Sequence, residues 1–262
     1  QSSDLAHGIE NSSGPLGQGH AYAAGAAIAE KFLEARLGHT MMQHKIYAYI
    51  SDGGVQEGIS SEVGRLAGNL GLNNLIMFYD ANDIQLSTEC GVVMCEDTAM
   101  KYQAWGWNVI KIDGNDPEAI RAALHTANKE ELRPTLIIGE TIMGKGALQA
   151  DGSSYEHNIK THGAPLGGEA YTNTIKHLGG DLNDPFQIFP EVQKLYDNRN
   201  AELRKIVAKR HADEAEWKRH NPSKAEQMQQ WFSGKAPKID WSGLVQKRDI
   251  PTRNGSAACL GV

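Results

Sequence analysis

Four short apolar runs, separated by segments with helical spacing, constrain the fold of this chain more than any other feature. The runs are rich in β-branched or aromatic residues, and each is short enough to be a buried strand. They cover residues 45–50, 75–79, 108–112 and 135–140. The regular alternation of strand and helix predicts an α/β fold built on a doubly wound parallel sheet.

Three further segments complete the organisation of the chain. Residues 19–37 are rich in alanine and predict a well-buried helix. Residues 144–166 are rich in glycine and lack periodicity, which is typical of a functional loop and suggests one that covers a site. Residues 186–250 are polar and strongly charged, and they predict a mostly helical linker with a solvated surface.

Composition excludes several classes of protein. With 262 residues, 40% of them hydrophobic, the chain can bury a full core. A net charge of −6 gives no general attraction to nucleic acid or to anionic membranes. The 3 cysteines form no CxxC pair, and no apolar run approaches the roughly 20 residues of a membrane span. We therefore expect a reduced, cytoplasmic protein with neither nucleic acid nor membrane as a partner.

Asp52 and Asn82 follow the first and second strand runs, and the residues between them predict a single helix. Neighbouring parallel strands end at the same edge of a sheet, so these side chains should meet there. Together with the backbone carbonyl of Ile84, they could hold a magnesium ion that carries a diphosphate. Alternatively, Asp52 lies in an ordinary Asp-Gly turn and Asn82 caps a helix. Spacing alone favours this alternative by about two to one.

Other candidate site residues also have two interpretations. Residues 14–19 (Gly-Pro-Leu-Gly-Gln-Gly) could let a ligand approach the backbone, or could form a tight loop before a buried helix. His162 could act as a hydrogen-bond donor or an acid/base, although most single histidines do neither. Glu57 and Glu62 lie near the start of the helix after Asp52, where carboxylates commonly serve as helix caps.

Taken together and in order, these motifs resemble the first domain of transketolase. The motifs are GPLGQG at 14–19, SDGGVQEGIS at 51–60, YDAN at 79–82 and HGAPL at 162–166. The likeness runs from about residue 8 to residue 170, and more loosely to the end of the chain. GPLGQG and HGAPL are specific to this family, whereas the Asp-Gly to Asn element is shared by thiamine diphosphate enzymes in general. The resemblance implies the thiamine-diphosphate-binding fold followed by the helical linker.

The resemblance also implies a domain organisation. Residues 1–185 would form a diphosphate-binding (PP) domain that lacks its N-terminal part, 186–250 the linker, and 251–262 the start of a pyrimidine-binding domain. The chain opens without an initiator methionine. Family histidines that hold diphosphate and substrate would precede Gln1, and the glutamate that activates the aminopyrimidine would lie in the pyrimidine domain. We therefore expect these 262 residues alone to be inactive.

Roles near the metal follow residue by residue from the resemblance. Asp52, Asn82 and the Ile84 carbonyl would bind a divalent cation, Mg²⁺ or Ca²⁺. Gly53 and Asn82 would contact the diphosphate of thiamine diphosphate. Ser51 stands where many relatives have glycine, which is tolerable if the backbone there is extended.

Further roles lie on the other motifs. The backbone of Gly14, Pro15 and Leu16 would line the cofactor site near the aminopyrimidine. His162 would bind the cofactor near its diphosphate and take a catalytic part beside the substrate. Glu57 and Glu62 would lie at the interface of a homodimer.

The activity implied by the resemblance is transketolase activity: transfer of a two-carbon ketol unit from a ketose phosphate to an aldose phosphate in the pentose phosphate pathway of carbohydrate metabolism. The enzyme would be a metal-binding transferase, completed by the remaining transketolase domains. Two relatives are alternatives: dihydroxyacetone synthase, and deoxyxylulose phosphate synthase, against which GPLGQG and HGAPL argue. A different alternative is a non-catalytic truncated or split subunit.

Overall fold

The structure is a computed structural model that describes residues 12–236, 238–245 and 247–261. The first eleven residues of the expected domain 1–185, and Val262 at the end of the expected segment 251–262, lie outside the described residues. Contacts divide the chain into two compact units, Gln1–Val207 and Ala208–Val262. The domain bounds expected from the sequence stay predictions.

The sheet of the first unit has four parallel strands in the order β1-β2-β4-β3. Their bounds are Ile46–Ser51 for β1, Leu75–Ala81 for β2, Asn108–Asp113 for β3 and Thr135–Glu140 for β4. Ser51 pairs with Asp80 at the carboxyl end of β1 and β2, so these two strands end side by side. The prediction of a parallel α/β sheet from four apolar runs is confirmed.

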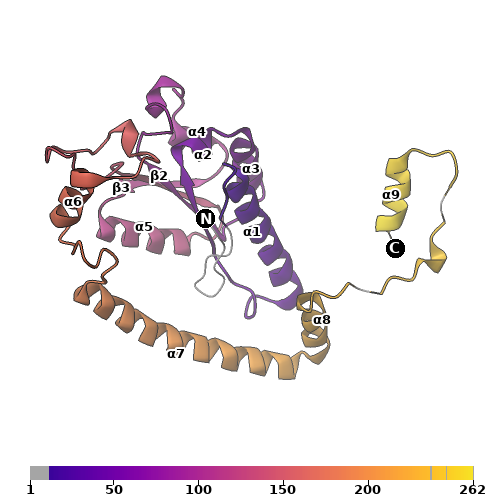
Figure 1. Ribbon diagram of the computed structural model, residues 1–262. Helices are drawn as coiled ribbons and strands as arrows, with labels where there is room; N and C mark the ends of the chain where they lie inside the picture. Colours follow the sequence, from indigo (N-terminus) through magenta and orange to yellow (C-terminus); the bar gives the residue numbers. More distant parts are fainter. Residues whose placement is uncertain (1–11, 237, 246, 262) are drawn as a thin grey trace. The chain divides into compact units, whose positions relative to one another are not determined.

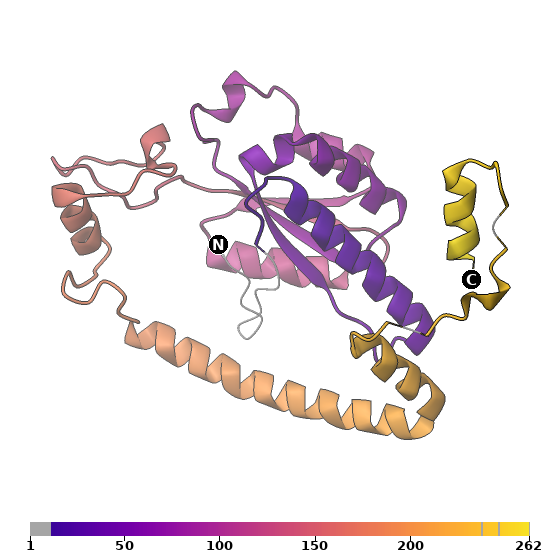
Figure 2. The ribbon, with the colours of Figure 1, turned by 45° about the vertical axis from the view of Figure 1, so that its right-hand side comes forward.

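Helices cover both faces of this sheet (Figures 1 and 2). On one face, α1, α3 and α4 pack against the alternate strand residues that include Leu75, Met77 and Tyr79. On the other face, α5 packs against Ile76 and Ile137. The first-unit helices that begin before residue 190 are α1 (Gln18–Leu37), α2 (Asp52–Gln56), α3 (Gly58–Asn69), α4 (Thr98–Ala104), α5 (Pro117–Lys129) and α6 (Gly168–His177). The period of two along each strand thus divides the core into two layers.

The alanine-rich helix α1 begins and ends where the sequence predicts, within one residue. Ala23, Ala24 and Ala27 are buried on its inner side. Small side chains at these positions let the helix backbone approach the sheet closely, and Asn74 supports this by donating a hydrogen bond to the carbonyl of Ala27 at 3.0 Å. The sheet and α1 therefore form a single packed core.

The expectation of one helix between Asp52 and Asn82 is wrong. Two helices occupy this segment, because Glu57 takes an extended conformation (φ −65°, ψ 138°) between α2 and α3. The break lets α2 make a single short turn beside the carboxyl end of β1, after which α3 crosses back along the sheet. The Ser51 backbone before α2 is also extended (φ −119°, ψ 170°), as expected if serine is to replace glycine there.

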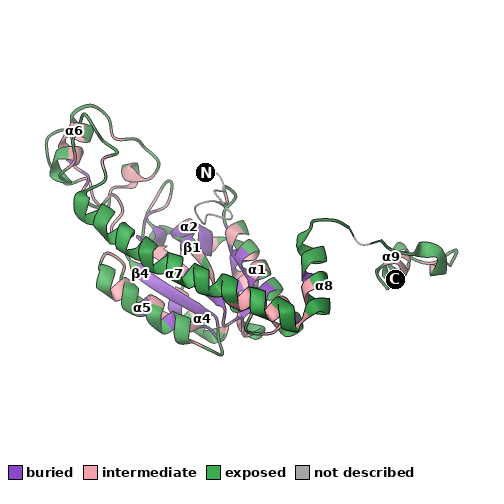
Figure 3. Cartoon of the chain, turned by 90° about the horizontal axis from the view of Figure 1, so that it is seen from below, coloured by how far each residue is buried: buried purple, intermediate pink, exposed green. Residues whose placement is uncertain are grey.

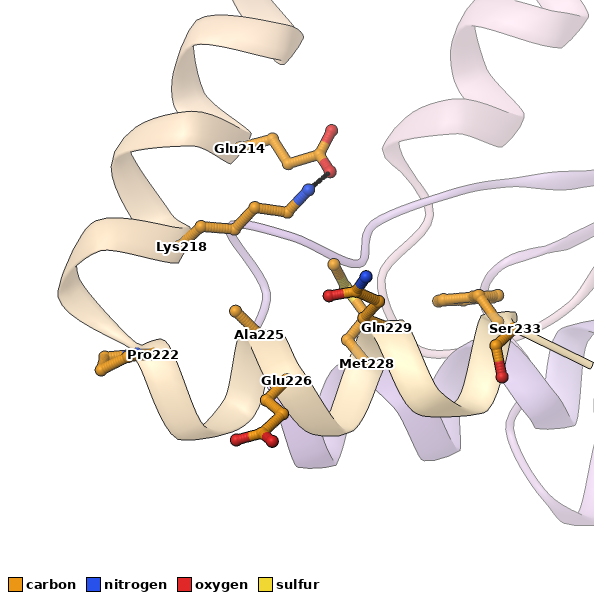
Figure 4. Close-up of a pocket in the computed structure, with 9 residues that line it drawn as sticks. Glu214, Lys218, Pro222, Ala225, Glu226, Met228, Gln229 and Ser233 are labelled. Atoms are coloured by element: carbon orange, nitrogen blue, oxygen red, sulfur yellow. Dashed lines mark ion pairs between the residues drawn. The ribbon is translucent and has the colours of Figure 1, made fainter. Parts of the chain in front are cut away.

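The C-terminal part of the chain is helical. It comprises α7 (Pro190–His220), within which the boundary between the units falls, then α8 (Pro222–Phe232) and α9 (Thr252–Leu260). No residue of α7 is buried, and Figure 3 shows its exposed surface. In the second unit, residues at the end of α7 and in α8 line a groove of about 680 Å³ (Figure 4), beside which Lys218 Nζ lies 2.6 Å from Glu214 Oε1. Among the described helices, none is long and apolar enough to span a membrane.

Candidate functional site

Asp52 and Asn82 meet at the carboxyl edge of the sheet, as their positions after β1 and β2 predict. The backbone N–H of Asn82 donates to Asp52 Oδ2 at 3.1 Å, and the N–H of Ile84 donates to Asn82 Oδ1 at 3.1 Å. Asp52 is 3% exposed and Asn82 is 9% exposed. The three residues expected at a metal are thus joined in one buried hydrogen-bonded set.

The alternative of a simple turn and a helix cap does not describe these two side chains. The Asp52 carboxylate reaches across to the next strand instead of closing its own turn. The Asn82 side chain accepts from the residue two positions on, and the next described helical turn, η2, begins only at Cys90. Asp52 thus links the end of β1 to the segment after β2, and Asn82 holds the backbone of that segment.

Two residues that the sequence motifs do not single out as ligands, Tyr79 and Cys90, complete the surroundings of Asp52. The Tyr79 hydroxyl donates to Asp52 Oδ1 at 2.6 Å, and burial together with this bond raises the pKa of the phenol. Burial, and then the neighbouring Asp52, raise the pKa of the Cys90 thiol to about 12, so the thiol stays protonated. Strand alternation from Leu75 and Met77 places Tyr79 on the same face of the sheet as Asp52, but no motif indicates the contact.

The 14–19 loop packs against the Asp52 turn and the start of α3. Gly17 has a left-handed backbone (φ 78°), and a Cβ there would come within 2.6 Å of Ile59 Cγ2 and 2.9 Å of Glu57 Cβ. Leu16 Cδ1 lies 3.1 Å from the position of a Cβ on Gly53. Glycine is therefore required at position 17, and the two motifs, although separated in sequence, pack against each other.

Buried polar groups brace the short α2 turn. Ser60 Oγ donates to the carbonyl oxygen of Gly54 at 2.6 Å, and Gly54 N lies 3.4 Å from its acceptor Ser51 Oγ. The His20 ring of α1 lies against this turn, with Nε2 3.6 Å from the position of a Cβ on Gly54. Burial lowers the pKa of His20 to about 4, so this ring is neutral at pH 7.

His162 lies in the 144–166 loop, at the end of the η3 turn Ile159–Thr161. The ring is half-buried, and its Nδ1 has no hydrogen-bond partner among the described residues. The loop is folded on itself: Gly146 N donates to Glu156 Oε1 at 2.8 Å, and Leu148 N donates to Thr174 Oγ1 of α6 at 2.9 Å. No hydrogen bond between described residues joins His162 to Asp52, so its part in the site stays a prediction.

Glu57 and Glu62 are both exposed. Glu57 is the N-terminal flanking residue of α3, but its side chain makes no capping hydrogen bond. Its place at the N-terminus of α3 is where a carboxylate suits the helix dipole, as the alternative interpretation expects. The interface role of both glutamates stays a prediction.

Asp52, Asn82 and the Ile84 carbonyl offer oxygen ligands of which only one is a carboxylate. Among the described residues, no group of three or more His, Cys, Asp or Glu side chains could hold a metal. One carboxylate, one carboxamide and a backbone carbonyl still fit Mg²⁺, which takes few protein oxygens when substrate phosphates and water fill its octahedron.

A separate hollow of about 470 Å³ lies on the opposite face of the sheet, toward α5. Its lining includes Tyr47 and Tyr49 of β1 and Phe78 of β2, and does not include Asp52, Asn82 or His162. At one end, the Thr141 hydroxyl donates to Asp80. The hollow is therefore distinct from the Asp52 site.

Residues 3–237 match the sequence model of a family described as "Transketolase, thiamine diphosphate binding domain". The chain is 37% identical to the plasmid transketolase of Cupriavidus necator, over 98% of this chain and 39% of that protein. It is 38% identical to transketolase 2 of Escherichia coli, over 92% of this chain and 35% of that protein. The chain thus spans less than half the length of these relatives.

Solved structures agree with the sequence comparison. The chain is similar to transketolase from Leishmania mexicana, with a TM-score of 0.84 and 31% identity over 97% of this chain and 38% of that one. It is similar to transketolase from Campylobacter jejuni, with a TM-score of 0.77 and 34% identity over the same shares, 97% and 38%. The fold therefore agrees with that of these transketolases throughout the matched length.

Proposed function

Because this chain belongs to the transketolase family and contains its thiamine diphosphate binding domain, we propose that it works as part of a transketolase. The activity is transfer of a two-carbon ketol unit from a ketose phosphate to an aldose phosphate. The observation that carries the proposal is the buried set of Asp52, Asn82 and Ile84 beside the 14–19 loop. A place in the pentose phosphate pathway and a cytoplasmic location belong to the same proposal and rest on the family resemblance.

In this proposal Asp52, Asn82 and the Ile84 carbonyl would hold Mg²⁺ or Ca²⁺, whose charge would offset that of the diphosphate. Gly53 leaves room for the phosphates because it carries no side chain, and Asn82 contacts them. When bound, thiamine diphosphate supplies the nucleophilic carbon and the electron sink that cleavage of a carbon–carbon bond needs. The protein residues provide position, charge and exclusion of water.

Two further motifs complete the proposed site. The backbone of Gly14, Pro15 and Leu16 lines the cofactor near its aminopyrimidine, and the packing of Leu16 on Gly53 supports this. His162 has a buried Nδ1 without a partner among the described residues. This histidine is available to bind the diphosphate and to hold or move a proton at the substrate.

Ketol transfer by the protein expressed from its complete gene tests the proposal. After treatment with a chelator and dialysis, we expect no turnover of a ketose phosphate donor with an aldose phosphate acceptor. Addition of both thiamine diphosphate and Mg²⁺ should restore it, because the cation joins the diphosphate to the protein. Residues 1–262 alone should stay inactive. Turnover that needs no thiamine diphosphate would contradict the assignment.

We also propose that the enzyme is a homodimer that uses the outer face of α3. Ile59, Leu66 and Leu70 are 41%, 47% and 49% exposed, and their spacing places them on one face of the helix with Glu62. An apolar stripe bordered by carboxylates suits a surface that is covered in an assembly.

The substitution Leu66→Arg should weaken this dimer, because it places a charge in the middle of the apolar face. We expect the dimer dissociation constant to rise at least about tenfold in sedimentation measurements on the complete protein. The matched control is Leu132→Arg, at an exposed loop position that is 77% accessible. A dimer that Leu66→Arg leaves as stable as Leu132→Arg does would exclude this face.

A further inference from the structure

The carboxylate of Asp52 is held at both of its oxygens. Oδ1 accepts the Tyr79 hydroxyl at 2.6 Å, and Oδ2 accepts the Asn82 N–H at 3.1 Å. Tyr79 is 5% exposed, and it belongs to the main core cluster between the sheet and α1. The phenol is therefore fixed by packing, and it fixes the carboxylate in turn.

The two hydrogen bonds are unequal. A bond of 2.6 Å between a hydroxyl and a buried carboxylate is short and charge-assisted, whereas an amide bond of 3.1 Å is at the long end of the normal range. A cation that binds Oδ2 competes only with the longer, weaker hydrogen bond, so Oδ2 is the oxygen more available to a cation.

We propose that Tyr79 restricts Asp52 to binding the cation through one oxygen, and that this shifts the preference of the site toward Mg²⁺ and away from Ca²⁺. Mg²⁺ demands a compact octahedron and uses one or two carboxylates, whereas Ca²⁺ accepts six to eight oxygens and takes carboxylates in one- or two-oxygen fashion. This inference rests on the proposed cofactor site. It assigns Tyr79 as a positioning residue, because its hydroxyl acts through Asp52.

Removal of the hydroxyl should change the choice of metal and not only its affinity. In Tyr79→Phe, Oδ1 loses the short bond from the Tyr79 hydroxyl, and the carboxylate gains freedom to offer both oxygens to a cation. The larger Ca²⁺ can bind the second carboxylate oxygen, and this added contact offsets the affinity that is lost because Asp52 is less ordered. The smaller Mg²⁺ does not use the second oxygen, so its affinity falls. A merely structural role of Tyr79 would weaken both ions alike.

The experiment is calorimetric titration of the complete protein with MgCl₂ and, separately, with CaCl₂, in the presence of thiamine diphosphate. For Tyr79→Phe we expect Mg²⁺ affinity to fall about tenfold and Ca²⁺ affinity to change by less than about threefold. The matched control is Tyr102→Phe, which removes a buried phenol hydroxyl from the same core cluster. It should leave the ratio of the two affinities unchanged.

Thermal unfolding without cofactor shows whether both variants fold, and Tyr79→Trp offers a second variant that removes the hydroxyl. A ratio of Mg²⁺ to Ca²⁺ affinity that stays the same in Tyr79→Phe, in a protein that still binds both ions, would overturn the role of Tyr79 alone. Failure of the unchanged protein to bind either ion with thiamine diphosphate would instead contradict the proposed cofactor site.

Discussion

Asp52→Ala is expected to lower the affinity for thiamine diphosphate with Mg²⁺ by at least about a hundredfold. Asp52 is the one carboxylate among the three residues proposed to hold the cation, so its removal takes away the charge that offsets the metal. The measurement is isothermal titration of the complete protein with thiamine diphosphate and MgCl₂. Ketol transfer at low cofactor concentration should fall in parallel.

The matched control is Asp83→Asn, one residue beyond Asn82. Asp83 is exposed and has a left-handed backbone (φ 64°), which asparagine tolerates well. This variant removes a carboxylate from the same loop and should bind the cofactor nearly as tightly as the unchanged protein. Asp52→Asn keeps the size of the side chain and serves if Asp52→Ala is poorly folded. Unchanged cofactor affinity in both Asp52 variants would contradict the assignment of Asp52 as a ligand.

Gly68→Ala should lower the free energy of unfolding by about 3 kcal/mol or more. A Cβ at this position of α3 would overlap the carbonyl oxygen of Trp105 and would lie 3.2 Å from Trp107 Cδ1. Backbone cannot move aside as a flexible side chain can, so α3 must shift away from the Trp105 to Trp107 segment. The measurement is unfolding in urea.

The control for this variant is Gly91→Ala, because a Cβ on Gly91 would meet nothing within 4 Å. It should change the free energy of unfolding by less than about 0.5 kcal/mol. The Gly68 prediction also extends to the site, since α3 carries Ser60 and the Glu57 segment that contacts Gly17. If Gly68→Ala unfolds at the same urea concentration as the unchanged protein, the close packing of α3 described above is wrong.

Most of the sheet could be predicted from the sequence, because local composition and period decide it. Strands β1 to β4 coincide with the four apolar runs to within one or two residues. Burial on both faces makes such runs continuous in a parallel sheet, so they are conspicuous. The meeting of Asp52 and Asn82 followed from the same rule, since residues after neighbouring parallel strands share an edge.

The break at Glu57 could not be predicted in this way. Glutamate itself is a good helix former, and the nearby glycines at 53, 54 and 58 weaken a helix without fixing where it breaks. The residue with the extended conformation, Glu57, takes part in a long-range contact: Gly17 of the 14–19 loop packs against Glu57 and Ile59. Local propensity carries no information about such a contact.

The sequence by itself determined which residues stand at the edge of the sheet, the oxygen chemistry they offer, and the family to which their order belongs. These depend on strand and helix periods and on short motifs, all of which are local. Only the tertiary structure decided which atoms meet: Tyr79 with one oxygen of Asp52, Asn82 with the other, and Leu16 with Gly53. Hydrogen bonds and close packing act over a few ångströms between segments distant in sequence, so they are set by the assembled fold.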